Sequence, residues 1–163
     1  MKMRTVVQLV LVLIMLTAMW GCGSGGNQSV TTQGTQKSVL LLSAPVKGID
    51  ITLVLPAGAT VSADPATGET LPGVVTLSGP NAGLANSYPL GIFTPASASV
   101  PAKVRIVLIS DTAFVAGEFF SVTCDVANGV TLAPTDFICE GLVLYDADTG
   151  SAITTGVSAT ITF

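Results

Sequence analysis

The nine residues EFFSVTCDV, residues 118–126, carry the clearest signal for the fold of this chain. Apolar and polar side chains alternate along the stretch with a period of two, so one set is expected to face a core and the other to face away from it. The inward set is Phe120, Val122, Cys124 and Val126, and the outward set is Phe119, Ser121, Thr123 and Asp125. This alternation predicts a β-strand with one buried face.

Seven further segments are also rich in Val, Ile, Thr and Phe, and clusters of Gly, Pro, Asn and Asp separate them. Short strands divided by turn residues indicate an all-β domain. One segment, VRIVLIS at residues 104–110, lacks alternation, so we expect it to lie mid-sheet with both faces covered. The pattern as a whole predicts a two-sheet antiparallel β-sandwich of about eight strands. The expected strands are Val39–Ser43, Asp50–Leu55, Thr60–Ala63, Gly73–Ser78, Lys103–Ser110, Glu118–Val126, Phe137–Tyr145 and Ala152–Phe163.

The N-terminus has the pattern of an export signal. Lys2 and Arg4 precede an apolar run over residues 5–20, which is shorter than the roughly 20 residues of a membrane span. Residues 23–37 contain one apolar residue and predict a flexible tether with a reach of about 20 Å. An uncleaved anchor helix and ordinary secretion with cleavage near Gly21 are the alternatives.

The residues at the end of the apolar run resemble a bacterial lipobox, since Met19, Trp20 and Gly21 stand directly ahead of Cys22. The resemblance implies that Cys22 carries lipid and becomes the new N-terminus, so that acyl chains are the membrane anchor. The expected organisation is a signal peptide over 1–21, a lipidated cysteine with its linker over 22–37, and a β-sandwich over 38–163. The resemblance places the protein in the bacterial cell envelope, at the outer membrane or cell surface.

Composition excludes several kinds of chemistry. The chain of 163 residues has no histidine, which removes histidine-based nucleophile pairs and His-ligated zinc. Beyond Lys2 and Arg4, four basic residues stand against ten acidic ones, and such a surface repels nucleic acid. The carboxylates left for catalysis, Asp111, Glu118 and Glu140, are scattered among expected strand ends. We therefore expect no enzyme, no cofactor and no nucleic-acid partner.

Two cysteines remain if Cys22 is acylated, namely Cys124 and Cys139. An envelope location permits a disulfide between them, which would stabilise the domain by about 3 kcal/mol through closure of a short loop. The alternative is that Cys124, on an apolar strand face, is a buried thiol that packs as a small apolar group. The sequence favours the disulfide only slightly.

Asp146 and Asp148 occupy alternate positions ahead of Gly150, as in the first part of many calcium loops. A full loop of that kind needs further oxygen ligands that are missing here. The sequence therefore favours a turn, which Asp146 begins and Gly150 completes with a positive φ. Calcium binding is the weaker alternative, and no other metal site is expected.

Residues 79–101 form a long connection, which is a common place for function in a compact domain. Tyr88, Leu90, Ile92 and Phe93 lie in it among Gly and Pro residues. One hypothesis is an exposed apolar lip that binds a partner. The favoured alternative is a flap that folds back over one end of the sandwich, with a short strand of its own.

The order of the segments resembles that of a cohesin-like sandwich. Pro56 and Gly58 form the early Pro-containing turn, Gly117 and Glu118 open the strand of alternating Phe and Val, and the last strand ends at Phe163. The resemblance implies a non-catalytic module that binds a protein partner. Carbohydrate binding linked to polysaccharide degradation is the alternative, although no Trp and only two Tyr follow Cys22. A purely structural envelope protein is the third hypothesis.

Overall fold

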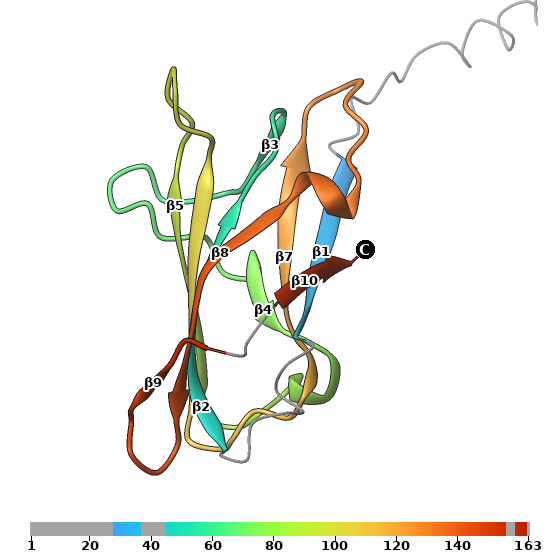
Figure 1. Cartoon of the computed structure of the whole chain (residues 1–163). Coiled ribbons are helices and arrows are strands. Elements are labelled where there is room, and N and C mark those ends of the chain that lie inside the picture. The colour runs from blue at the N-terminus through green and yellow to red at the C-terminus, as the bar shows by residue number, and fades with distance from the viewer. Residues whose placement is uncertain (1–27, 37–44, 156–158, 163) are drawn as a thin grey trace, which may run out of the picture.

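The computed structural model describes residues 28–36, 45–155 and 159–162, which form two antiparallel β-sheets packed face to face (Figure 1). This confirms the predicted all-β class with two antiparallel sheets. The expected strand Val39–Ser43 lies outside the described residues. Within the described ranges, no helix is long and apolar enough to cross a membrane.

The first sheet is centred on β7 (Gly117–Val126), the strand that the alternating stretch predicts. One side of β7 pairs with β1 (Gln28–Gln36), which in turn pairs with β10 (Ala159–Thr162). The other side pairs with β3 (Ala59–Thr60) and β4 (Val75–Leu77). β7 thus pairs with three strands, β1, β3 and β4, and is the central strand of this sheet.

The second sheet has the order β5-β6-β2-β8-β9. Its strands are β5 (Ser87–Thr94), β6 (Lys103–Ser110), β2 (Val46–Val54), β8 (Ile138–Asp146) and β9 (Ala152–Ile153). The predicted strand Lys103–Ser110 agrees with β6 at both ends. The expected last strand, Ala152–Phe163, instead divides into β9 and β10, which belong to different sheets. The described chain therefore passes between sheets where the sequence predicts one strand.

The core fills the space between the sheets. Its members come from alternate positions of the long strands, as a period of two requires. The most deeply buried side chains are Ile49, Ile51, Leu53, Leu55, Val104, Ile106, Leu108, Phe119, Phe120, Val122 and Leu144. The predicted inward set of β7 is confirmed, because all four of its members are buried.

Phe119 departs from the predicted alternation, since it is buried although it was expected to face outward. The register between β1 and β7 shifts at this point: Gly34 is opposite Phe120, while Thr35 is opposite Glu118. The extra residue is Phe119, and a bulge of this kind re-aims the side chain. Both rings therefore enter the core, with an edge-to-face contact of 4.9 Å between centroids.

The expectation that VRIVLIS is covered on both faces is wrong. In β6 the inward side chains Val104, Ile106 and Leu108 are fully buried, whereas Arg105 and Ile109 are exposed. The strand does lie mid-sheet, between β5 and β2, but nothing in the described structure covers its outer face. Apolar residues on that face therefore lie at the surface.

Two described strands lie outside the eight expected strands. Gln28–Gln36, expected to be part of a tether over 22–37, forms β1, because its backbone pairs with β7 and β10 on its two sides. Ser87–Thr94, in the long connection over 79–101, pairs with β6 along its whole length as β5. The tether expectation therefore does not hold for residues 28–36, whereas the connection does contain a strand, as the flap alternative allowed.

The outer edge of β5 is partly paired by the chain that precedes β4. Thr70 donates its N–H to the carbonyl of Gly91 at 2.9 Å, and Phe93 donates to the carbonyl of Gly68 at 2.7 Å. Gly91 permits this approach, because a Cβ there would stand 2.6 Å from the Thr70 hydroxyl oxygen. Two residues before Gly91, the same edge carries Pro89, which has no N–H to donate.

Candidate functional site

Four neighbouring strands of the second sheet align side chains in one row across its outer face. The row contains Tyr88 of β5, Ile109 of β6, Gly48 of β2 and Tyr145 of β8, each opposite the next in register. Tyr88 is 62% exposed, Ile109 56% and Tyr145 38%. We call this row the tyrosine face. An apolar surface with a tyrosine at each flank is typical of binding surfaces.

Tyr145 lies across Gly48. A Cβ on Gly48 would come within 3.0 Å of the Tyr145 Cβ and Cδ2 atoms, so the missing side chain makes room for the ring. A shallow groove of about 480 Å³ opens here, bordered by Tyr145, Ile109 and Val107 on its apolar side. The charged residues Asp50, Arg105, Lys47 and Asp146 also border it. The groove thus combines an aromatic ring, aliphatic side chains and an ion pair.

The ion pair beside the groove is bidentate. The Nε atom of Arg105 donates to Oδ1 of Asp50 at 3.1 Å, and Nη2 donates to Oδ2. The hydrogen bonds and the negative charge of Asp50 raise the pKa of Arg105. Because Arg105 is largely exposed, the pair adds little to folding stability. Its consequence for the site is that the guanidinium charge at this margin of the groove is already paired with a carboxylate.

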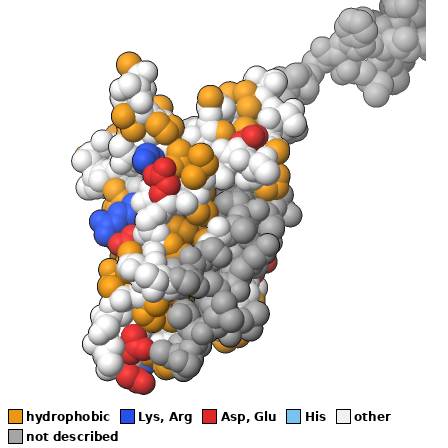
Figure 2. Space-filling model, in the orientation of Figure 1, with side chains coloured by type: hydrophobic (Ala, Val, Ile, Leu, Met, Phe, Trp, Pro, Cys, Tyr) orange, Lys and Arg blue, Asp and Glu red, His pale blue; other side chains and the backbone are white. Residues whose placement is uncertain are grey.

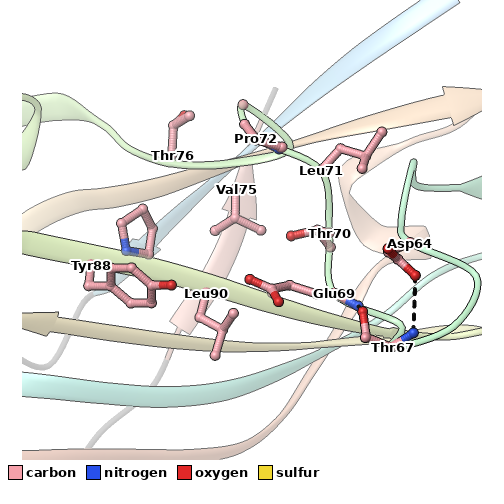
Figure 3. A pocket seen from close by; sticks show the side chains of 13 residues that line it. Asp64, Thr67, Glu69, Thr70, Leu71, Pro72, Val75, Thr76, Tyr88 and Leu90 are labelled. Carbon is pink, nitrogen blue, oxygen red and sulfur yellow. Dashed lines mark hydrogen bonds between the residues drawn. The ribbon is translucent and has the colours of Figure 1, made fainter.

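A second hollow, which we call the edge pocket, lies between β5 and the chain that precedes β4 (Figure 3). Its volume is about 580 Å³. Tyr88 and Leu90 line it from β5, and Figure 3 shows the Glu69 carboxylate on the opposite wall. The Asp64 side chain stabilises its own turn, because its Oδ1 atom accepts hydrogen bonds from the backbone N–H groups of Ala66 and Thr67. Tyr88 belongs to both sites and connects them.

The four residues predicted as a binding lip are all in β5. Tyr88 and Ile92 are exposed, Leu90 is half-buried, and Phe93 packs against the core. They form a sheet edge and part of its outer face rather than a loop lip. The sequence analysis missed Ile109 and Val107, because it treated β6 as buried on both faces. Lys103 and Arg105, two positions apart, were the signal that one face of β6 meets water.

Cys124 and Cys139 are on opposite sheets, in β7 and β8, and the structure has both as thiols with no disulfide between them. Cys124 is buried in the core, and Cys139 packs against it. Burial raises the pKa of the Cys139 thiol to about 11, so the thiol stays protonated and unreactive at neutral pH. Cys124 thus lies on the core face of β7, as the buried-thiol alternative describes, and the disulfide between Cys124 and Cys139 stays a prediction.

Asp146 and Asp148 form the predicted turn between β8 and β9. Oδ1 of Asp146 accepts hydrogen bonds from the N–H of Asp148 at 3.0 Å and from the N–H and hydroxyl of Thr149 at 2.8 and 2.9 Å. These donors, those of Thr149 foremost, lower the pKa of Asp146. Gly150 completes the turn with φ +67°. A calcium ion would have to compete with three donors for the same oxygen.

The remaining carboxylates of the sequence analysis do not converge. Glu140 accepts a hydrogen bond from Lys103 at 2.9 Å near the start of β6, whereas Asp111 follows the end of β6 and Glu118 lies near the start of β7. Among the residues that the structure describes, no three His, Cys, Asp or Glu side chains gather as a metal site would require. Cys22, the predicted lipidation site, lies outside the described residues.

Comparison with known proteins identifies no relative: no family model, no curated protein and no solved structure matches this chain.

Proposed function

We propose that this protein is a non-catalytic, lipid-anchored envelope protein that binds a protein partner through the tyrosine face of a cohesin-like sandwich. The observation that carries the proposal is the row Tyr88, Ile109, Gly48 and Tyr145, which stays exposed across four paired strands. Tyrosine and arginine are the side chains that most often dominate protein interfaces, and Arg105 lies beside the row.

The ion pair supports a protein partner for a second reason. Asp50 already neutralises Arg105, so the patch carries an apolar centre with a paired charge at its margin. Interfaces of moderate affinity have this composition, with an apolar core and a polar rim. The rest of the surface is acidic, which discourages nonspecific contact with other acidic proteins and with nucleic acid.

Photocrosslinking in intact cells tests the partner. A photoreactive amino acid at Ile109 should capture a defined protein, whereas the same group at exposed Thr60, in β3 of the other sheet, should not. The captured species should disappear in a Tyr145→Ala variant whose melting temperature is unchanged. Equal capture at both positions, or none at Ile109, would contradict the proposal.

Mass spectrometry tests the anchor independently. Protein extracted from membranes should begin at Cys22 and carry the mass of at least a diacylglycerol group. A chain that retains Met1, or that is recovered without lipid, would overturn the anchor and leave the partner proposal standing.

A glycan is the second candidate ligand, favoured by the position of Tyr145 over Gly48 beside Asp50 and Arg105. An aromatic ring against a flat sheet with charged hydrogen-bonding groups beside it is suited to the apolar face and hydroxyls of a sugar. A glycan array with the wild type and Tyr145→Ala separates the two candidates. A glycan signal lost in the variant would favour this second function over the first.

A further inference from the structure

We infer that one end of the sandwich, formed by residues 55–60, 95–102 and 127–135, rests on the lipid bilayer and sets the strands upright on the membrane. We call it the uncharged end. The inference rests on the proposed lipid anchor at Cys22, and it adds a contact surface and an orientation that the anchor alone does not supply.

The three segments lie at one end of the molecule. Leu55 donates its N–H to the carbonyl of Ala102 at 2.8 Å, which joins the first segment to the second. Ala127 donates to the carbonyl of Gly58 at 2.8 Å, which joins the first to the third. A Cβ on Gly58 would stand 2.9 Å from the side chain of Val130, so the first and third segments are packed against one another.

None of the three segments contains Asp, Glu, Lys or Arg. The charged residues that directly border them are Lys103 and Asp136, and the Asp136 carboxylate accepts a hydrogen bond from the N–H of Ala133 at 2.8 Å. Most residues of the uncharged end are exposed, and the largest exposed aliphatic side chain there is Val100, at 46%. Figure 2 shows orange and white over the uppermost tips of this face of the molecule, with red and blue side chains below them and further red side chains at the lower end. A surface of small uncharged residues loses little hydration free energy when it contacts lipid headgroups.

The opposite end is charged. Asp111 follows β6, Glu118 opens β7, and Asp146 and Asp148 form the turn after β8. Lys47 is the basic residue at the start of β2 there. Acidic groups are repelled by the anionic lipids of a bacterial membrane, so this end is disfavoured at the bilayer surface.

The chain enters the described fold at the uncharged end. β1 begins at Gln28, which pairs with Val126, and Val126 pairs on its other side with Ala59. Only five residues separate Cys22 from Gln28, a span of about 20 Å even when fully extended. The strand β7, with ten residues, is about 33 Å long. The anchor therefore holds the uncharged end near the bilayer, and the charged end lies farther than the connecting segment can reach.

The contact is shallow and depends on the anchor. The three segments contain no aromatic side chain, and Trp and Tyr are the residues that hold proteins at the membrane interface. The orientation that results directs the strands away from the membrane and the tyrosine face sideways. A partner would therefore approach along the membrane plane.

The test uses the full lipidated chain in vesicles of phosphatidylethanolamine and phosphatidylglycerol. An environment-sensitive dye is attached to Ser97→Cys at the uncharged end or to Thr112→Cys at the opposite end, both of which are exposed. The native thiols interfere little at neutral pH, since Cys124 is buried and the pKa of Cys139 is about 11. The dye at position 97 should be several-fold less accessible to an aqueous quencher than the dye at position 112.

Charge variants give the matched control. Ala57→Glu, in the first of the three segments, should restore quencher access at position 97, whereas Thr112→Glu should leave it unchanged. Equal access at positions 97 and 112 in membrane-bound protein would overturn the inference and leave the lipid anchor intact. Recovery of the chain without membranes would overturn the anchor and the inference together.

Discussion

The two faces of β6 differ although their residues are of the same kind. Ile106 and Leu108 face the first sheet and are fully buried, whereas Val107 and Ile109 face away from it and border an open groove. An apolar side chain in this strand therefore contributes to folding only if the opposing sheet covers it. The outer apolar residues contribute little to the core, which leaves them available for recognition.

The largest expected effect comes from the same substitution on the two faces. Ile106→Ala should lower the free energy of unfolding by about 2–5 kcal/mol, because it leaves a cavity between the sheets. Ile109→Ala, three residues on, should cost about 1 kcal/mol or less, because water already reaches that side chain. Urea denaturation of the two variants measures the difference. Equal losses would mean that the outer face is also part of the folded core.

The next effect concerns Asn81, a buried polar residue at the end of the short 3₁₀ turn η2 (Gly79–Asn81). Its side chain accepts from the N–H of Val115 at 2.7 Å and donates to the carbonyls of Val115 and Glu118 at 3.0 Å. Asn81→Ala should cost about 1–3 kcal/mol, because those backbone groups lose their partner. Exposed Asn128→Ala is the control, with an expected change within about 0.5 kcal/mol. Similar melting temperatures for both variants would contradict this role.

Gly48→Ala tests how the Tyr145 ring packs on the outer face of the second sheet. The added methyl group would stand 3.0 Å from Tyr145, so the ring must move, while the buried face of β2 is untouched. We expect a stability change of about 1 kcal/mol or less and a ring more open to water. In a Tyr88→Phe background, tyrosine fluorescence then reports Tyr145, and acrylamide should quench it more strongly in the Gly48→Ala protein. Unchanged quenching would mean that the ring does not lie over Gly48.

The smallest effect is a pH dependence at the turn after β8. The pKa of Asp146 is lowered in the folded protein, so its charged form contributes stability that is fully present above its ordinary pKa of 3.8. That contribution is lost as the pH falls through the lower, folded value. The melting-temperature difference between wild type and Asp146→Asn should therefore be constant at neutral pH and shrink below about pH 4. Asp148→Asn should show no such trend, and a trend of equal size there would assign the effect to net charge.

The sequence predicted those strands whose signal is local. β7 and β6 alternate or carry dense β-branched residues, and their predicted bounds fall within one residue of the structure. The turn at Asp146 was also predictable, because Asp and Gly have backbone preferences that do not depend on distant residues. The class of fold follows from these elements.

The features that the sequence did not predict depend on contacts between residues that are distant in the chain. Pro89 and Gly91 are typical of loops, but Gly91 pairs within β5, where the close approach of Thr70 leaves no room for a Cβ. The Phe119 side chain points into the core because the register between β7 and β1 shifts at this residue. The tyrosine face joins Tyr88, Ile109 and Tyr145 from three separate strands, so no single window of sequence contains it.

Pro89 has a consequence for a protein confined to a surface. Under the proposed lipid anchor, copies would diffuse in two dimensions at high local concentration, where exposed strand edges can join side by side into fibrils. Pro89 has no N–H on the open part of the β5 edge, and the 68–70 segment pairs with the remainder. A neighbouring copy would therefore meet an interrupted row of backbone donors and acceptors, which disfavours polymerisation through this edge.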